Sequence, residues 1–547
     1  MTKKFPTLLE KFYFWEQTAP NDVFLRQPIN RQWREFTWKE VGDQARRIAS
    51  ALKDLGLPAG SRVAIISKNC AEWFIADLAI MLNGYVSVPL YAQQPDDAMR
   101  YVLSHSGAKA AFVGKLDDPA HIQSIIPEDI TQIGFPFEGI STELRWNELL
   151  NKYPPLTENH YPELDDVFTL IYTSGTTGNP KGVVHTFKHP AFVVENGLPV
   201  FNVTRKDRLF SFLPLAHVAE RMLVEVSSFY VGGTVSFPES LETFSQDLCD
   251  VEPTVFFSVP RLWTKFQLGV LENMSQEKLD KLLRIPVLSW FVKKKIRKAL
   301  GLNKAHLVLS GAAPVPVPMM EWFGKIGIHI QEAYGATEAF CYGFLNRKDD
   351  IRMGTVGKPL PGLEAKIDEN GEIMMRCGSV MVGYYLEPEK TEETLEDGFY
   401  RTGDIGEFDS EGYLKITGRV KDAFKTQKGE FVSPAEIENQ FTENTLIEQI
   451  CVLGRGFVQP LALVMLSENA QTQPQDKVQQ ELQKTMDKIN KTLKPHEVLN
   501  GVVVVKDEWL PDNGFMTPTL KIKRNVMEKY YQALMEEYAE CRSVVWE

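Results

Sequence analysis

Apolar side chains alternate between helical and strand spacing in the first third of the chain, and this alternation limits the fold more than any other feature. From residue 41 to 52 they recur every three to four positions, and the pattern ends at Gly56, a typical helix terminator. Residues 62–67 read as a buried strand, residues 72–82 as a second helix and residues 85–90 as a second strand. Such alternation is typical of a parallel sheet with crossover helices, so the sequence predicts an α/β layer structure.

The middle of the chain continues with short strand candidates, and the pattern changes after it. Further strand candidates cover residues 166–172, 254–258 and 305–310. Beyond about Leu360, short strands alternate with glycine turns, as in residues 371–376 and 412–418.

The chain of 547 residues is long enough for more than one domain. We expect a large N-terminal domain of stacked α/β sheets with a small β subdomain over residues 1–418, a linker at 419–422 and a small α+β domain over 423–547. Within the last of these, the glutamine-rich residues 471–480 are predicted to form a solvated loop that leads into a helix.

Composition excludes several classes of protein. The formal net charge of −12 argues against a broad nucleic-acid surface, which needs an excess of Lys and Arg. The six cysteines show no CxxC spacing, which favours reduced thiols over a disulfide framework or a zinc site. The first residues lack the apolar core of a signal peptide, and the apolar stretch 73–88 is interrupted by polar residues and glycine. We therefore expect a cytoplasmic protein that does not cross a membrane.

One segment departs from the acidic average. Residues 281–304 contain eight Lys or Arg and no Asp or Glu, and from Trp290 to Lys298 an apolar run meets a basic run. This composition is typical of a segment that lies on an anionic membrane surface, although a solvated helix face has the same pattern. The sequence therefore predicts peripheral membrane contact through Trp290–Lys298, at the inner surface of the membrane.

The strongest local motif is Tyr-Thr-Ser-Gly-Thr-Thr-Gly-Asn-Pro-Lys-Gly at residues 172–182, directly after a predicted strand. Glycines let the backbone approach an anion, hydroxyls donate to oxygens and a lysine adds positive charge. The motif is not the Walker type, because Pro180 stands where that motif needs glycine. A generic surface turn is the alternative, and the motif favours a polyphosphate-binding loop.

Three weaker motifs follow. Glu338 could hold Mg²⁺, Thr337 could donate to a phosphate and Tyr334 offers a ring for a purine, although such a turn is often structural. Asp404 lies in a glycine turn that suits ribose hydroxyls, and Arg419 stands where the chain leaves the large domain, although the motif could equally be a turn with a surface ion pair. Lys521 stands in a basic cluster that the neighbouring proline and threonines fix as a loop, although most basic clusters are solvated.

Together the four motifs resemble those of the adenylate-forming superfamily, which includes acyl-CoA synthetases, luciferases and nonribosomal-peptide adenylation domains. The resemblance covers nearly the whole chain. Leu-Pro-Leu-Ala-His-Val-Ala-Glu-Arg at residues 213–221 and Ser-Val-Pro-Arg-Leu-Trp at 258–263 look like the long-chain fatty acyl-CoA synthetase branch.

The resemblance implies a role for each motif residue. The phosphate loop would comprise Thr173, Ser174, Gly175, Thr176, Thr177, Gly178 and Lys181, and Mg²⁺ would be held by Glu338 and Thr173. Adenine would lie between Tyr334–Gly335 and the wall Gly311, Ala312 and Ala313, and the ribose would meet Asp404 and Arg419. The catalytic set would be Lys521, Glu338, Thr337 and His217; a histidine that only packs in the core is the alternative for His217. The small domain would be mobile, with Lys421 as its hinge, and Gly429 would line the coenzyme A passage.

The implied reaction converts a fatty acid, ATP and coenzyme A to acyl-CoA, AMP and pyrophosphate through an acyl-adenylate. Three alternatives stay open: an acyl-AMP ligase that loads a carrier protein, a ligase for medium-chain or aryl acids, and a catalytically silent nucleotide-binding scaffold. The sequence leaves the chain length, the acceptor thiol, the pathway and the oligomeric state open, a dimer included.

Overall fold

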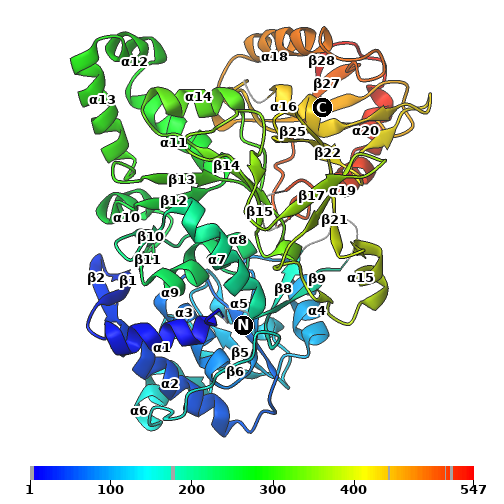
Figure 1. The fold of residues 1–547 in the computed structure, drawn as a ribbon. Coiled ribbons are helices and arrows are strands. Elements are labelled where there is room, and N and C mark those ends of the chain that lie inside the picture. The colour runs from blue at the N-terminus through cyan, green and yellow to red at the C-terminus, as the bar shows by residue number, and fades with distance from the viewer. Residues whose placement is uncertain (1–4, 174–178, 442–443, 512, 518–520) are drawn as a thin grey trace.

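The computed structural model describes residues 5–173, 179–441, 444–511, 513–517 and 521–547. A large body formed by the first three quarters of the chain carries a smaller C-terminal domain beside its upper half (Figure 1). The α/β prediction for the large domain is confirmed, and the strands at residues 62–67, 85–90, 166–172, 254–258 and 305–310 are all present within one or two residues of their predicted bounds.

An eight-stranded sheet organises the first part of the chain in the order β19-β9-β8-β4-β3-β5-β6-β7. The strands from β8 to β7 run parallel, whereas β9 and β19 are antiparallel to their neighbours. Their bounds are β3 Arg62–Ile66, β4 Val86–Leu90, β5 Ala110–Val113, β6 Thr131–Gly134, β7 Leu144–Arg145, β8 Val167–Thr173, β9 Lys181–Thr186 and β19 Gly383–Tyr384.

Helices link and cover these strands. α2 (Trp38–Asp54) begins at the capping box of Thr37 and Glu40, ends before Gly56 in the left-handed region, and buries the apolar stripe predicted from its spacing. α3 (Ala71–Leu82) is buried on every side. The other helices of this part are α1 Leu8–Thr18, α4 Asp96–Ser106, α5 Pro119–Ile125, α6 Trp146–Lys152 and α7 Lys188–Phe201.

Two further sheets complete the α/β body. One has the order β12-β13-β14-β15-β16, of which β12, β13 and β14 are parallel; the other has the order β10-β11-β1-β2. The bounds are β12 Val255–Ser258, β13 Leu307–Ser310, β14 Gln331–Gly335, β15 Gly343–Leu345 and β16 Lys358–Pro359, and β1 Val23–Ile29, β2 Gln32–Thr37, β10 Arg208–Phe210 and β11 Thr234–Ser236. The polar motif residues follow the carboxyl ends of β13 and β14, where ligands of parallel sheets usually bind.

The predicted small β subdomain is a separate sheet, β17-β18-β21-β20, with β22 paired to β21. Its strands are β17 Glu364–Ile367, β18 Glu372–Arg376, β20 Leu395–Glu396, β21 Phe399–Phe408 and β22 Leu414–Arg419. β21 and β22 are antiparallel, and their register sets Asp404 opposite Arg419. Two motif residues from different strands therefore become cross-strand neighbours.

The C-terminal segment has its own sheet and core. β25-β26-β27-β28 form a mixed sheet, and β23 and β24 pair as a short hairpin. The elements are β23 Phe424–Lys425, β24 Phe431–Val432, β25 Ile447–Leu453, β26 Leu461–Leu466, β27 Gly501–Val504 and β28 Val544–Trp546, with helices α16 Pro434–Phe441, α17 Glu468–Gln471, α18 Gln475–Asn490, α19 Arg524–Tyr530 and α20 Gln532–Glu537. Its buried side chains form clusters separate from those of the large domain.

The prediction of a loop over residues 471–480 is wrong for most of that stretch, because α18 already starts at Gln475. Its first turns bury Val478 and Leu482, which are spaced by four residues, so two apolar anchors outweigh the polar composition around them. Among the residues that the structure describes, no helix has both the length and the apolar character needed to cross a membrane.

Candidate active site

Asp404 is the centre of a hydrogen-bonded group at the edge of the large domain. Its buried carboxylate accepts a hydrogen bond from the Tyr334 hydroxyl at 2.6 Å through Oδ2 and pairs with Nε of Arg419 at 2.8 Å through Oδ1. Burial, and then the negative charge of Asp404, raise the pKa of Tyr334 well above its usual value, so the tyrosine keeps its proton and remains a donor. These contacts fix the Tyr334 ring beside the acidic residue that the sequence associates with ribose.

Glu338 lies in the short 3₁₀ turn η2 (Thr337–Ala339) that follows β14. Its Oε1 accepts a hydrogen bond from the Tyr384 hydroxyl at 2.8 Å, and Nζ of Lys181 lies 4.4 Å from the centre of the Tyr384 ring. Burial and the positive charge of Lys421 lower the pKa of Lys181, while Glu338 acts in the opposite direction. A lysine, a tyrosine and a carboxylate from three separate segments therefore face one another.

Two buried histidines lie behind this turn. Nε2 of His185 donates to the backbone carbonyl of Thr337 at 2.8 Å, since a carbonyl can only accept, and Nδ1 of His185 lies 2.8 Å from Nδ1 of His189. Burial lowers the pKa of His185 well below its usual value and that of His189 to about 4, so both rings are neutral near pH 7. The pair fixes the position of the segment that carries Thr337 and Glu338.

Lys521 brings the C-terminal domain into the same group of charges. Its pKa is lowered to about 8, first by desolvation and then by the guanidinium of Arg419, whereas the carboxylates of Asp404 and Glu338 act to raise it. Although the residue keeps solvent-exposed surface, the surrounding protein removes enough water to disfavour the ammonium. Four charged side chains of the sequence motifs thus interact electrostatically across two domains.

His217 belongs to the same neighbourhood. It caps the short helix α8 (Val218–Glu220), where its Nδ1 accepts from the amide of Ala219 at 3.2 Å. Burial, and then the charge of Lys521, lower the pKa of His217 to about 4, so the ring is neutral near pH 7. His217 thus interacts electrostatically with Lys521, and its ring nitrogen has a local structural partner in the cap of α8.

The segment Gly311–Ala313 follows the carboxyl end of β13. A Cβ on Gly311 would lie 2.7 Å from the carbonyl oxygen of Ala333, so only glycine allows this close approach to β14. Ala312 has a φ of +64°, a left-handed conformation that costs energy for a residue with a Cβ. Ala312 and Ala313 are exposed, and they form a small, strained wall after the same sheet that positions Tyr334.

The remaining predicted site residues that the structure describes lie at strand ends and in exposed turns. Thr173 ends β8 and lies opposite Lys181 at the start of β9, so the loop motif connects two antiparallel strands. Ser174, Gly175, Thr176, Thr177 and Gly178 lie outside the described residues. Gly335 is exposed, and a Cβ there would lie 2.7 Å from the Cys341 carbonyl oxygen. Lys421 is exposed just after β22, and Gly429 is exposed in the turn of the β23–β24 hairpin, with a φ of +82°.

An apolar cavity is lined by residues that follow His217 and Glu338 closely in the sequence. Its walls are α7, the π-helix η1 (Arg221–Val226) and the strands β12 and β13, and they include Val194, Leu198, Met222, Val224, Phe257 and Cys341. A π-helix inserts an extra residue into a helical turn and often occurs at functional sites. η1 continues α8 directly, so the helix that His217 caps leads into the cavity wall.

The acidic residues of the site suit a metal ion that arrives with its ligand. In the described segments no cluster of three or more His, Cys, Asp or Glu side chains could hold an ion alone. Mg²⁺ usually binds through one or two carboxylates together with substrate phosphates and water. Glu338, with one oxygen already engaged by Tyr384, fits a single-carboxylate role of this kind.

Comparison with known proteins gives matches over nearly the whole chain. The family model "AMP-binding enzyme" matches residues 13–385, and the model "AMP-binding enzyme C-terminal domain" matches residues 421–541. The long-chain-fatty-acid–CoA ligase FadD15 of Mycobacterium tuberculosis is 29% identical over 95% of both chains. Long chain acyl-CoA synthetase 1 of Arabidopsis thaliana is 30% identical over 92% of this chain and 87% of its own.

Solved structures show the same fold. An anthranilate CoA ligase in complex with anthranoyl-AMP superimposes with a TM-score of 0.80 at 22% identity, over 97% of this chain and 98% of its own. The adenylation domain of a carboxylate reductase from Mycobacterium chelonae gives a TM-score of 0.81 at 20% identity, over 98% of this chain and 91% of its own. With a family model that spans well over half of the sequence and a second that matches the small domain, the chain belongs to the AMP-binding enzyme family.

Proposed function

We propose that this protein is an AMP-forming acid–thiol ligase that activates a long-chain fatty acid and transfers it to coenzyme A. The observation that carries the proposal is the electrostatic group in which Lys521 of the small domain meets Arg419, Asp404 and Glu338 of the large domain. A mononucleotide, a metal ion and an acid can meet only where such groups converge. The names of the curated relatives support the choice of a fatty acid and of coenzyme A.

In the first step, an oxygen of the acid attacks the α-phosphorus of ATP, an O–P bond forms, and the P–O bond to pyrophosphate breaks. Negative charge accumulates on the phosphate oxygens during this step. The ammonium of Lys521 and the side chains of Lys181 and Thr337 supply fixed positive charge and hydrogen-bond donors there. A Mg²⁺ ion held by Glu338, with the hydroxyl of Thr173 as a second ligand, would neutralise charge on the triphosphate.

The nucleotide is oriented by groups that do not react. Asp404 and Arg419 suit the ribose hydroxyls, since a carboxylate accepts hydrogen bonds from both. The Tyr334 ring, fixed by its bond to Asp404, and Gly335 suit one face of the adenine, with Gly311, Ala312 and Ala313 on the other. Thr173 and Lys181, which pair across β8 and β9, flank the loop. We propose that Ser174–Gly178 of this loop complete the phosphate site.

In the second step, the thiol of coenzyme A attacks the acyl carbon, a C–S bond forms, the C–O bond to AMP breaks, and the thiol proton passes to water. This step requires a different position of the small domain, residues 423–547. We propose that residues 419–422 form the hinge, with Lys421 as its pivot, and that rotation exchanges Lys521 for the turn that contains Gly429.

The apolar cavity supports an alkyl acid over a polar one. It encloses about 50 Å³ between α7 and η1, which is room for only a few methylene groups, so a long chain has to displace side chains such as Met222. Three rotatable bonds make methionine well suited to such adjustment. His217, before the cavity wall, is proposed to border the carboxylate end of the acid.

The experiment is an incubation with ATP, Mg²⁺ and a graded series of fatty and aryl acids, with and without coenzyme A. AMP release that needs both a long-chain acid and coenzyme A supports the proposal. Stable acyl-AMP that coenzyme A does not consume would favour a ligase that loads a carrier protein. Absence of acid-dependent ATP–pyrophosphate exchange would favour the silent nucleotide-binding scaffold.

The proposal also includes a membrane from which the protein collects its poorly soluble acid. We propose a cytoplasmic protein that contacts an anionic membrane peripherally through Trp290–Lys298. If replacement of Lys293, Lys294 and Lys295 by Gln leaves binding to anionic vesicles unchanged, this contact is wrong.

A further inference from the structure

The chain between β12 and β13 forms an arm of three helices on the outer edge of the large domain, at the upper left in Figure 1. These are α11 (Pro260–Asn273), α12 (Gln276–Leu283) and α13 (Pro286–Ala299). Arg297 of α13 donates to the backbone carbonyl of Ile326, just beyond α14 (Val317–Lys325), at 3.4 Å. β12 and β13 also line the apolar cavity, so the arm is the direct connection between two walls of that cavity.

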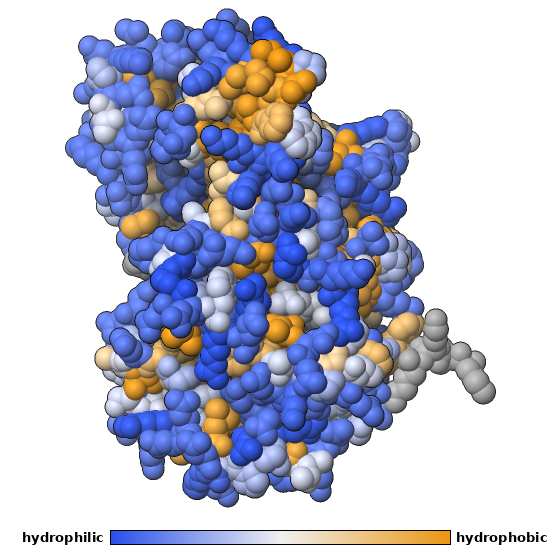
Figure 2. Space-filling view, turned by 90° about the vertical axis from the view of Figure 1, so that its left-hand side faces the viewer, coloured by the Kyte–Doolittle hydropathy of each residue, from blue (hydrophilic) through white to orange (hydrophobic). Residues whose placement is uncertain are grey.

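Large apolar side chains are exposed on one stretch of this arm. Val287 is 70% exposed, Phe291 58% and Trp290 55%, and Ile285 and Leu288 are exposed as well. Figure 2, which faces this side of the molecule, shows apolar surface gathered near the top. Nζ of Lys294 lies 4.9 Å from the centre of the Trp290 ring. Contiguous exposed apolar residues with basic neighbours are typical of an interaction surface.

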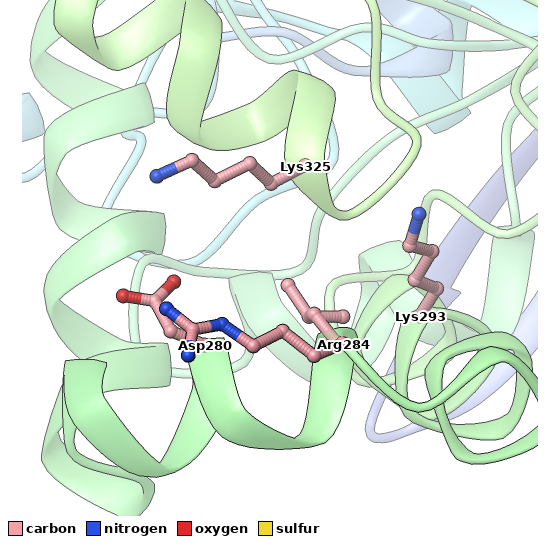
Figure 3. A pocket seen from close by; sticks show the side chains of 5 residues that line it. Asp280, Arg284, Lys293 and Lys325 are labelled. Atoms are coloured by element: carbon pink, nitrogen blue, oxygen red, sulfur yellow. The ribbon is translucent and has the colours of Figure 1, made fainter.

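An open pocket of about 440 Å³ lies between α12, α13 and α14, and two of its lining residues, Arg284 and Lys293, flank the exposed apolar stretch in sequence. Arg284, just beyond α12, and Lys325 of α14 enter it from opposite sides, and Lys293 of α13 lines it further along (Figure 3). Asp280 lies beside Arg284 and accepts a hydrogen bond from the amide of Gln276 at 2.9 Å. Three cations against one carboxylate leave the pocket with net positive charge.

We propose that this pocket binds the phosphate headgroup of an anionic phospholipid, while Val287, Leu288, Trp290 and Phe291 enter the apolar layer of the membrane. The proposal rests on the membrane contact stated above and adds a defined site to it. Phosphate suits Arg284 and Lys325 because guanidinium and ammonium groups form charge-assisted hydrogen bonds with its oxygens.

The choice of a membrane as the partner follows from charge and apolarity together. The protein as a whole carries a net charge of −12 and is therefore repelled by anionic surfaces, so the eight basic residues of the segment 281–304 have to act locally. A nucleic acid would use the cations but would leave Val287 and Phe291 exposed to water. An anionic lipid surface accommodates both groups on the same helix, with the cations at the headgroups and the apolar side chains below them.

The experiment measures vesicle binding by the full-length protein without substrate, on phosphatidylcholine vesicles and on vesicles with about 30% phosphatidylglycerol. The pocket variant is R284Q/K325Q. The matched control is K295Q/K298Q, which removes the same charge from exposed positions of α13 outside the pocket. Thermal unfolding and adenylation of a soluble short-chain acid check that both variants are folded.

Each basic residue near an anionic surface strengthens binding about fivefold, so both double variants weaken binding at low salt. At about 0.5 M salt the diffuse attraction is largely screened. We expect the control variant to approach the wild type there, whereas the pocket variant still binds at least tenfold more weakly. Equal losses of the two variants at every salt concentration would overturn the pocket and leave the membrane contact intact.

Two further measurements separate the remaining possibilities. Wild-type protein that binds neither kind of vesicle, or binds both equally, contradicts a headgroup site and the anionic membrane contact together. Glycerol phosphate added at millimolar concentration should compete only weakly, because a free phosphate lacks the apolar contacts; full displacement would identify a soluble phosphate compound as the ligand instead. Neither result depends on which acid the active site takes.

Discussion

The lowered pKa of Lys521 gives a sharp prediction about pH. In the proposed mechanism Lys521 acts as an ammonium, and its pKa of about 8 means that the charged form predominates below pH 7 and is lost as pH rises through 8. At pH 9, one unit above the pKa, about a tenth of the molecules keep the proton. We expect kcat/KM for acid-dependent ATP–pyrophosphate exchange to fall about tenfold between pH 7 and pH 9, because this quantity reports the free enzyme.

The rate at saturating ATP should behave differently. A bound triphosphate raises the pKa of Lys521, so the alkaline limb of kcat should lie at higher pH than that of kcat/KM. The variant K521R keeps its charge throughout the range, and it should react more slowly but lack the limb near pH 8. K521A should lose about 10²–10³-fold at all pH values, as expected for removal of one donor at a developing negative charge.

Another group could produce the same limb, and K521R tests for it. Burial raises the pKa of Glu220 to about 8, while Ser211 and the amide of Phe212 donate hydrogen bonds to it. If K521R keeps a limb with the wild-type midpoint, the limb belongs to Glu220 or to another such group, and the role assigned to Lys521 is refuted.

Three more substitutions test the site and its scaffold. E338Q should slow pyrophosphate exchange about 100-fold and raise the Mg²⁺ concentration needed for half-maximal rate, because one hard oxygen ligand is weakened. D404N should raise KM for ATP about 10–100-fold with a smaller effect on kcat, since hydrogen bonds to a charged acceptor contribute about 1.5–3 kcal/mol. R221M should lower the free energy of unfolding by about 3–5 kcal/mol in urea titrations, since it leaves Asp77 and Glu225, which pair with the buried guanidinium at 3.0 and 3.1 Å, without a counter-charge. Unchanged values in any of these measurements would contradict the contact on which that prediction depends.

Strands and motif residues could be predicted from the sequence because their signals are local. A buried strand such as β3 or β12 is a short apolar run, and the glycine that ends α2 is visible next to the helical stripe. The family resemblance assigns Asp404 and Arg419 a shared role at the ribose, and the antiparallel register of β21 and β22 brings the two side chains together. Nothing in the residues between them indicates this register.

Contacts between distant segments left no comparable signal. Tyr384, which bridges Glu338 and Lys181, is one tyrosine in a short strand, and its partner Glu338 is 46 residues away. His185 occupies a buried position of β9 and reaches Thr337 across 152 residues. Both residues were missed, because a donor directed at one particular carbonyl or carboxylate is a property of the folded geometry. Only an unexpected polar residue within an apolar strand could have pointed to His185.

The charges of the site favour a polyanionic ligand. Desolvation is the main cause of the lowered pKa of Lys521 and of Lys181, and Arg419 and Lys421, respectively, lower these pKa values further, so two pairs of like charges repel each other. A folded protein tolerates such repulsion only where surrounding contacts fix the groups or a counter-ion normally relieves it. Asp404 and Glu338 offset part of the positive charge, but each is already engaged by a tyrosine hydroxyl. The remaining positive potential calls for a polyanion that can meet groups of both domains at once, and a triphosphate fits this requirement better than any single side chain could.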